Sequence, residues 1–263
     1  MGIKMKIGIY YKQENHEIVE QIKKEIKKYD LSIDNRKPDI VFSVGGDGTF
    51  LRAVHMYMDR LDEIHFIGIN SGSLGFFYDF SKEEIPQIVE SIANKTYALK
   101  EHALLKGEVK FKKSETTIYA LNEIRIENPF HTLISDVFIN KEKLENYRGN
   151  GLIVASTLGS SAYNKSLGGA LIDNDLDALE LTEIAGIQNN VYRSLGSSLV
   201  IKGDKSLSFS GQLGNSVVGY DHLNIQNDDS LLELKVSYCE KKVKIIYSES
   251  HSYIQKIRKS FVL

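Results

Sequence analysis

The segment Gly45–Thr49, which reads Gly-Gly-Asp-Gly-Thr, combines three glycines with one carboxylate in a pattern that could bind phosphate and act on a hydroxyl. Glycines let the backbone approach a ligand closely, and the free N–H groups at the start of a helix favour an anion. The carboxylate of Asp47 would repel phosphate, so this residue must have another role. Two roles fit: Asp47 could hold a magnesium ion, or it could accept the proton of a hydroxyl that attacks a phosphoryl group.

A plain turn between a strand and a helix is the alternative explanation of these glycines. By chance, however, the five residues in this order are expected only on the order of once in thousands of chains of this length. The segment is not a Walker loop, because no Gly-Lys-Ser/Thr follows it, and it also lacks the dinucleotide fingerprint. Any NAD binding would therefore not be of the Rossmann type.

Alternating strand and helix patterns over the first hundred residues must position this turn. Residues 6–11, 39–44 and 65–70 are short apolar runs typical of buried strands, and apolar residues recur at helical spacing between them. This alternation predicts a parallel sheet with right-handed crossovers. The glycine turn then lies at the carboxyl end of the second strand, where α/β sheets bind phosphate.

The pattern changes near residue 100, after which short strand-like segments are separated by turn residues. We predict an α/β domain with a parallel sheet over residues 1–100 and an all-β domain over residues 101–247. Residues 248–263 are predicted to form a tail with helical spacing that packs back on the body of the protein. Within the β-rich part, Leu176–Ile187 has the spacing of a helix.

Composition limits the classes of function. The 263 residues are 42% hydrophobic, which is enough to bury a core, and the 33 basic and 35 acidic residues nearly cancel. We therefore expect neither a nucleic-acid nor a membrane partner. Cys239 is the single cysteine, so an intramolecular disulfide and a cysteine zinc site are excluded. The histidines lack metal-ligand spacing, no targeting signal or membrane span is recognised, and the expected location is cytoplasmic.

Further motifs make a resemblance specific. They are Leu74–Phe76, Asn122–Glu123, Tyr147–Leu152, Gly159–Asn164, Ser166–Ala170, Thr182–Ala185 and Asp221–His222. Together with the glycine turn, their order and spacing resemble the NAD kinase family, particularly its compact bacterial members. Diacylglycerol kinases and phosphofructokinases share the glycine loop, but the later motifs are not features of phosphofructokinases.

The resemblance implies a two-domain fold of the NAD kinase/diacylglycerol kinase type. It also implies transfer of the γ-phosphate of ATP, with Mg²⁺ or another divalent cation, to the 2′-hydroxyl of the adenosine ribose of NAD. Asp47 would then be the base or the residue that orients the hydroxyl. The residues implied to lie at NAD or the phosphates are Gly46, Gly48, Phe76, Asn122, Glu123, Arg148, Asn150, Ser161, Ala162, Tyr163, Asn164, Ser166, Ala185, Tyr192 and His222.

Some of these positions carry further implications. Ala185 and Tyr192 match positions that, in the family, meet NAD bound by a neighbouring subunit, so a homo-oligomer, commonly a tetramer, is implied. Asn122 and Glu123 are adjacent on a predicted strand, where they would point to opposite faces, so both can touch one ligand only at a bend or bulge. A polar strand end is the alternative explanation of this pair, and a core tyrosine is the alternative explanation of Tyr163.

The chain departs from the family pattern at three positions: Asn150 replaces the acid of a Gly-Asp-Gly motif, Leu158 replaces a small polar residue, and Ser198 replaces a proline. Because Asn supplies no negative charge, we expect weaker or altered NAD binding with the phosphoryl chemistry of Asp47 intact. The chain would be a divergent member. Two other functions stay open: a lipid or small-alcohol kinase with the same loop, and a non-catalytic NAD(P)-binding sensor.

Overall fold

The structure, a computed structural model, describes residues 4–72, 75–214, 216–225, 230–249 and 251–263. The chain divides into two compact units. Unit 1 comprises Met1–His102 and Lys241–Leu263, and unit 2 comprises Ala103–Glu240. The divisions fall within the two long strands β5 (Ala98–Phe111) and β16 (Leu231–Tyr247), so each of these strands contributes residues to both units.

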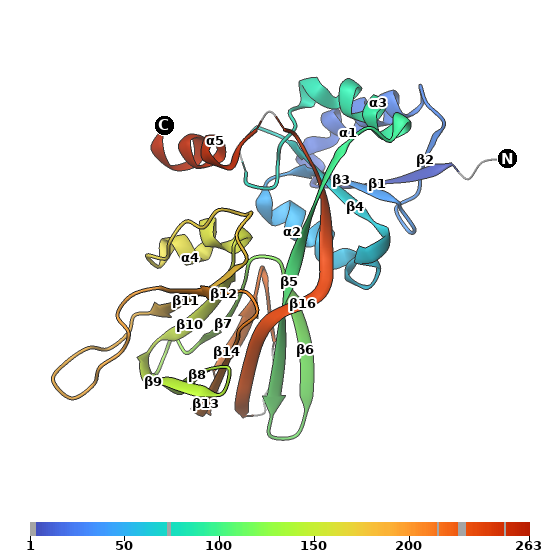
Figure 1. The fold of residues 1–263 in the computed structure, drawn as a ribbon. Helices are drawn as coiled ribbons and strands as arrows, with labels where there is room; N and C mark the ends of the chain where they lie inside the picture. Colours follow the sequence, from blue (N-terminus) through green and yellow to red (C-terminus); the bar gives the residue numbers. More distant parts are fainter. Residues whose placement is uncertain (1–3, 73–74, 215, 226–229, 250) are drawn as a thin grey trace. The chain divides into compact units, whose positions relative to one another are not determined.

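Unit 1 contains a parallel sheet with the strand order β2-β1-β3-β4 (Figure 1). The strands are β1 (Met5–Tyr11), β2 (Leu31–Ile33), β3 (Ile40–Gly45) and β4 (His65–Asn70). The last part of β16 also belongs to this sheet, because Lys244–Ile246 pairs in parallel with His65–Ile67 of β4. The sequence-based prediction of a parallel α/β sheet is thus confirmed.

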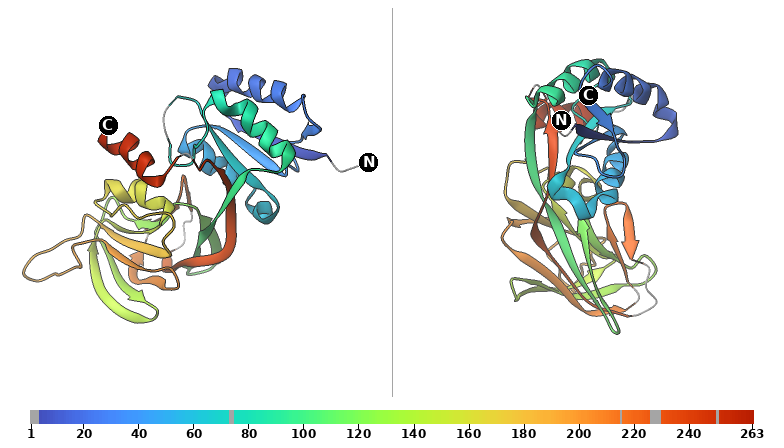
Figure 2. Two further views of the ribbon diagram at one scale, coloured as in Figure 1. Left: turned by 45° about the horizontal axis from the view of Figure 1, so that its top comes forward. Right: turned by 90° about the vertical axis from the view of Figure 1, so that its right-hand side faces the viewer.

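Helices cover both faces of this sheet. The helices α1 (His16–Ile26) and α3 (Ile85–Asn94) lie side by side over one face (Figure 2), where Ile22 and Ile88 join a core with Phe42. The helix α2 (Asp47–Met56) covers the other face, where the ring of Phe50 lies 6.1 Å from that of Phe66. Burial on both faces explains why the strands are continuously apolar. The remaining short helices are η1 (Gln13–Asn15), η2 (Met58–Glu63), η3 (Lys82–Glu84), α5 (Tyr253–Ile257) and η5 (Arg258–Val262).

Unit 2 contains antiparallel sheets. One has the order β16-β13-β8-β9, with β5 pairing to β16 and β6, and the other has the order β12-β11-β10-β7-β14-β15. The bounds are β6 (Glu115–Ala120), β7 (Glu123–Glu127), β8 (Leu133–Ile139), β9 (Glu142–Gly149), β10 (Gly151–Ser156), β11 (Ala178–Ile184), β12 (Leu199–Lys202), β13 (Ser206–Gly214), β14 (Val217–Tyr220) and β15 (Leu223–Ile225). The short helices η4 (Leu158–Ser161) and α4 (Tyr163–Ser166) follow β10.

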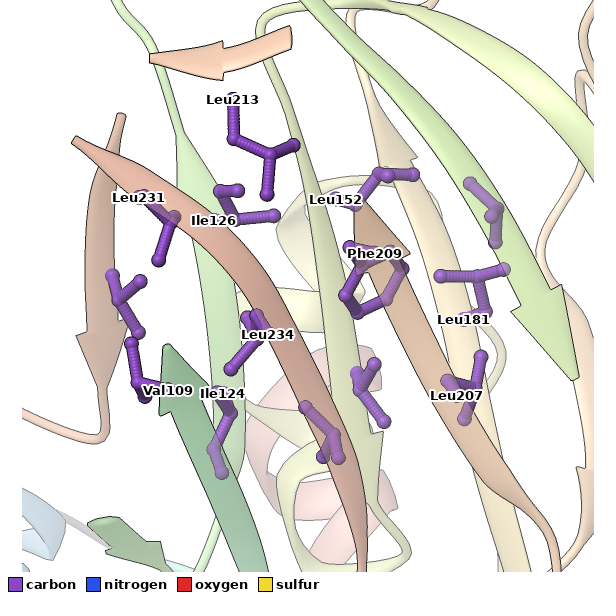
Figure 3. Packing of buried hydrophobic residues seen from close by; sticks show 14 of the residues in the cluster. Val109, Ile124, Ile126, Leu152, Leu181, Leu207, Phe209, Leu213, Leu231 and Leu234 are labelled. Atoms are coloured by element: carbon purple, nitrogen blue, oxygen red, sulfur yellow. The ribbon is translucent and has the colours of Figure 1, made fainter. Parts of the chain in front are cut away.

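The core of unit 2 lies between its sheets. Figure 3 shows Ile126 and Leu152 from one sheet packing near Phe209 and Leu234 from the other, and all four side chains are buried. Burying a side chain of this size contributes about 1.5–3 kcal/mol, so this core is the main source of stability for unit 2. The predicted β-rich second half is confirmed.

The helix expected at Leu176–Ile187 is wrong, because this segment forms strand β11. The strand pairs antiparallel with β10 on one side and β12 on the other. Leu179, Glu180 and Leu181 are all fully buried, so both faces of the strand are covered at these positions, because successive side chains of a strand point to opposite faces. Hydrogen bonding on both sides therefore overrides a helical spacing of apolar residues. Among the described residues, the structure has no helix that combines the length and the apolar character needed to cross a membrane.

Candidate functional site

The glycine turn of unit 1 joins the end of β3 to the start of α2. Gly45 has φ +152°, a conformation that favours glycine, and Gly46 is the extended residue before the helix. The phenol of Tyr78 donates a hydrogen bond to the carbonyl of Gly46 (2.8 Å), which fixes the turn. A Cβ atom on Gly46 would meet no described atom within 4 Å. The turn therefore leaves open space at the N-terminus of α2, where an anion is favoured.

The carboxylate of Asp47 is held by backbone N–H groups. Its Oδ2 accepts a hydrogen bond from the N–H of Phe76 (3.0 Å), and its Oδ1 accepts one from the N–H of Phe77 (3.1 Å). Burial raises the pKa of Asp47, while these two hydrogen bonds and the charge of Lys256 act in the opposite direction. A carboxylate with a raised pKa is a stronger base, so this environment suits proton acceptance.

Two roles were considered for Asp47: holding a magnesium ion and orienting a hydroxyl. In the described part of the chain, no group of three or more His, Cys, Asp or Glu side chains is arranged to hold a metal ion. Because magnesium commonly binds through substrate phosphates together with one or two carboxylates, both roles stay open for Asp47.

Phe76 and its neighbours connect the turn to the C-terminal tail within unit 1. The ring of Phe76 lies 5.6 Å from the ring of Phe261 and 6.4 Å from that of Tyr253. Its backbone N–H, as described above, reaches Asp47. Leu74, the first residue of the motif to which Phe76 belongs, lies outside the described residues.

In unit 2, the pair Asn122–Glu123 lies at a bend, as a shared ligand would require. The backbone bends at Leu121 and Asn122, immediately before β7 begins at Glu123. The carboxylate of Asp221 stabilises the bend by accepting the N–H groups of Leu121 (2.9 Å) and Asn122 (2.8 Å).

Both side chains of this pair are buried with unused hydrogen-bonding capacity. Asn122 and Glu123 are each 5% exposed. Neither Asn122 Oδ1 nor Glu123 Oε2 has a hydrogen-bond partner in the part of the chain that the structure describes. Buried polar atoms are nearly always paired in native proteins, so two adjacent unpaired oxygens indicate a site for a polar ligand.

Burial also changes the charge of Glu123. Burial, with a smaller contribution from the nearby Asp221 carboxylate, raises the pKa of this carboxyl to about 8, while Arg125 opposes the shift. At neutral pH the side chain is therefore largely protonated and able to donate a hydrogen bond as well as accept one.

Two residues of this site were not predicted from the sequence: Arg125 and Glu127. They lie at alternate positions of β7 after Glu123, so all three side chains share one face of the strand. Arg125 Nε donates to Glu127 (2.8 Å), and its guanidinium lies 5.7 Å from the ring centre of Tyr163. The period-two repeat of charged residues in an otherwise apolar strand was the signal that could have identified them.

Tyr163 offers an accessible aromatic surface beside these charges. The residue is 37% exposed, and its hydroxyl donates a weak hydrogen bond to Glu127 (3.3 Å). The alternative of a fully buried core tyrosine is therefore wrong. An exposed ring next to an arginine and two carboxyl groups can stack on a flat heterocycle.

A second cluster in unit 2 brings together Arg148, Asn150, Ala185 and Tyr192. The Arg148 guanidinium lies 4.2 Å from the Tyr192 ring centre, and its buried Nε has no hydrogen-bond partner among the described residues. Asn150 donates through Nδ2 to the carbonyl of Asn128 (3.2 Å), and Ala185 has a positive φ of 50°. The cluster lies near the carboxyl end of β7, because Gly151, which follows Asn150, is paired with Glu127, the last residue of that strand.

The other predicted residues of unit 2 have varied surroundings. Asn164 is fully buried and donates to Glu180 (2.6 Å), while its Oδ1 has no partner within the described ranges. Ser161 donates to the carbonyl of Leu158 (3.3 Å). Ala162 is half-buried at the start of α4, and Ser166 is exposed at its end. His222 is exposed in the turn after β14.

Comparison with known protein families agrees with this geometry over most of the chain. Residues 3–97 match the model of the ATP-NAD kinase N-terminal domain, and residues 121–248 match the model of the ATP-NAD kinase C-terminal domain. The chain is 39% identical over 238 residues to NAD kinase 1 of Listeria monocytogenes serotype 4b (strain F2365), covering 89% of this chain and 90% of the relative. It is 34% identical over 261 residues to the NAD kinase of Leuconostoc mesenteroides, with 98% of each chain covered.

Solved structures share the fold. The yeast NADH kinase complexed with NADH has a TM-score of 0.83 at 19% identity, covering 98% of this chain and 87% of the other. An NAD kinase from Archaeoglobus fulgidus in complex with ATP has a TM-score of 0.80 at 21% identity, covering 97% and 99%. At these identities the structures establish the shared fold alone.

Proposed function

The chain belongs to the NAD kinase family, and from this premise we propose that it transfers the γ-phosphate of ATP to the 2′-hydroxyl of the adenosine ribose of NAD. The products are NADP and ADP. The observation that carries the proposal is the carboxylate of Asp47, held by two backbone N–H groups beside an open glycine turn at the start of a helix.

In the proposed reaction, Asp47 orients the 2′-hydroxyl and accepts its proton as the hydroxyl oxygen bonds to the γ-phosphorus. The bond between that phosphorus and the bridging oxygen of ADP breaks, and ADP leaves with the electron pair. The N–H groups near Gly46 and Gly48 face the phosphates at the N-terminus of α2. Phosphoryl transfer depends mainly on such positioning and on neutralisation of charge.

We propose that the divalent cation, Mg²⁺ or a substitute, enters with ATP as part of the substrate. Mg²⁺ commonly binds through substrate phosphates and keeps several water ligands, so it does not require a cage of protein carboxylates. The cation would neutralise charge on the transferred group.

The polar side chains of Asn122 and Glu123 in unit 2, together with Tyr163, are proposed to bind the nucleotide. The unpaired oxygens of Asn122 and Glu123 suit hydrogen-bond donors such as an adenine amino group or ribose hydroxyls, and Tyr163 supplies a ring for stacking. Arg148 would meet a phosphate. Asn150 presents no negative charge where the family usually has an acid, so we expect altered affinity for NAD while the transfer chemistry is retained.

We further propose a homo-oligomer, a tetramer by resemblance, in which Ala185 and Tyr192 meet NAD bound by another subunit. The loop between β11 and β12, which extends away from the sheet of unit 2 in Figure 1, carries Val191 with 77% exposure. Exposed apolar residues of this kind are common at protein interfaces.

A cytoplasmic location is proposed because the single cysteine, Cys239, gives no sign of a disulfide framework.

The test is a coupled assay with ATP, Mg²⁺ and NAD in which an NADP-specific dehydrogenase detects NADP. We expect turnover by the unmodified protein and a loss of about a hundredfold or more in kcat for Asp47→Asn. NAD binding without turnover in the unmodified protein would instead support a sensor. Absence of both binding and turnover would favour a kinase for a lipid or another alcohol.

A further inference from the structure

The C-terminal tail contacts the segment that holds Asp47. Lys256 Nζ, on α5, donates a hydrogen bond to the carbonyl of Phe76 (2.8 Å) and forms an ion pair with Asp79 (2.5 Å). The two charged side chains are only 15% and 7% exposed, so water and salt screen the pair weakly. Phe76 also packs against Phe261 of the tail. The tail is therefore fixed to residues 76–79 by charge and by apolar contact.

A single peptide group connects Lys256 to Asp47. The carbonyl of Phe76 and the N–H of Phe77 belong to the same planar unit. Lys256 donates to this carbonyl, and this N–H donates to Asp47 Oδ1 at 3.1 Å. A positive charge at the carbonyl polarises the peptide group and strengthens its N–H as a donor. Rotation of the peptide would also break one or both hydrogen bonds, so Lys256 restrains its orientation.

We propose that Lys256 is a positioning residue for phosphoryl transfer: it acts through the Phe76–Phe77 peptide to fix the direction of the Asp47 carboxylate. The inference rests on the proposed function, in which Asp47 accepts the proton of the attacking hydroxyl. A small misplacement of such a group lowers the rate strongly, because catalysis depends on near-attack geometry.

The electrostatics of unit 1 agree with this role. In the described part of the structure, the titratable groups that face Asp47 are Lys256 and the Tyr78 phenol, which donates to the carbonyl of Gly46. The charge of Lys256 lowers the pKa of Asp47 against the larger effect of burial. Loss of this charge should therefore raise the pKa of Asp47 and leave less of the base form at neutral pH.

The experiment compares Lys256→Met with Lys256→Arg and with Lys259→Met, which removes an equal charge from an exposed position of the same tail. We expect kcat to fall about tenfold in Lys256→Met, with the KM values for ATP and NAD changed less than threefold. In a plot of kcat against pH for Lys256→Met, the fall in kcat on the acid side (the acid limb) should occur at higher pH than in the unmodified protein. Lys256→Arg, which keeps the charge and the donors, should recover most of the activity, and Lys259→Met should match the unmodified protein.

The proposal is overturned if kcat and the acid limb of Lys256→Met equal those of the unmodified protein. An unshifted acid limb with lowered kcat likewise overturns it, since that result indicates a purely structural effect. If Lys256→Met does not fold, Lys256→Gln, which keeps a donor but lacks the charge, serves for the same comparison. If the unmodified protein makes no NADP, the proposed function fails. The effect of Lys256 on Asp47 can still be tested in that case, by measuring the pKa of Asp47 with carbon-13 NMR in the unmodified protein and in Lys256→Met.

Discussion

Gly75 approaches the side chain of Asp47 so closely that a Cβ atom on residue 75 would overlap the carboxylate. The segment that donates to Asp47 begins with this residue, so the absence of a side chain there lets the backbone come within hydrogen-bond distance of both carboxylate oxygens. The catalytic group proposed here is thus held by the backbone of a second loop, and the glycine is what makes the approach possible.

The first prediction is that Gly75→Ala lowers both stability and activity. The added methyl group must displace Asp47 or the Phe76 backbone, so we expect a cost of about 1–3 kcal/mol in the free energy of unfolding. We also expect kcat to fall at least about tenfold. Denaturant unfolding and the NADP assay provide the two measurements. In an Asp47→Ala background the overlap is absent, so the same substitution should cost much less stability; an equal cost in both backgrounds would refute the explanation.

The second prediction concerns the decline of kcat at acid pH. Burial raises the pKa of Asp47 in the folded protein, and the base form is the active one. The value of kcat should therefore be greatest at higher pH and decline as the pH falls through this pKa, which lies above the ordinary range of Asp. The measurement is kcat against pH at saturating ATP and NAD. A profile that stays flat down to the ordinary Asp range would show that Asp47 is not the titrating base.

The third prediction is that Glu123→Gln stabilises the protein at alkaline pH. The folded-state pKa of Glu123 is raised to about 8, so the folded form holds a proton that the unfolded chain has released. Stability from this group is present at low pH and declines as the pH rises from about 4.5 to about 8. Gln has no proton to lose, so the variant should melt at least roughly 4 °C higher than the unmodified protein at pH 8.5, with little difference at pH 5.

Glu115→Gln provides the matched control for this pH dependence, because Glu115 is an exposed carboxylate on β6. Thermal melts of all three proteins at both pH values make the comparison. Equal melting temperatures for Glu123→Gln and the unmodified protein at pH 8.5 would show that Glu123 is not held protonated by burial.

The fourth prediction separates the ring of Tyr163 from its hydroxyl. Tyr163→Ala removes the exposed stacking surface beside Arg125, and we expect the KM for NAD to rise about tenfold, since stacking on an aromatic side chain is worth about 1–3 kcal/mol. Tyr163→Phe keeps the ring and loses a weak 3.3 Å hydrogen bond to Glu127, so its KM should change less than about threefold. Similar KM values for both variants would argue against stacking on this ring.

Much of the framework followed from local sequence patterns. The Gly45–Thr49 turn and the strand–helix alternation around it were predicted because buried strands and amphipathic helices have distinct periodicities. A bend was expected at Asn122 and Glu123, because adjacent residues on a straight strand cannot both contact one ligand, and the structure contains a bend at Asn122. The pattern failed at Leu176–Ile187, where apolar spacing suited a helix but pairing with strands on both sides decided the conformation.

Tertiary structure alone decided which distant groups support the proposed chemistry. No local pattern indicates that β16 returns to pair with β4, or that Lys256 reaches the carbonyl of Phe76, because both contacts join segments far apart in the chain. The same holds for the protonated state of Glu123, which depends on the removal of water by folding. The sequence by itself specified the types of chemical groups and their local turns, whereas folding determined their burial, their hydrogen-bond partners and therefore their charge.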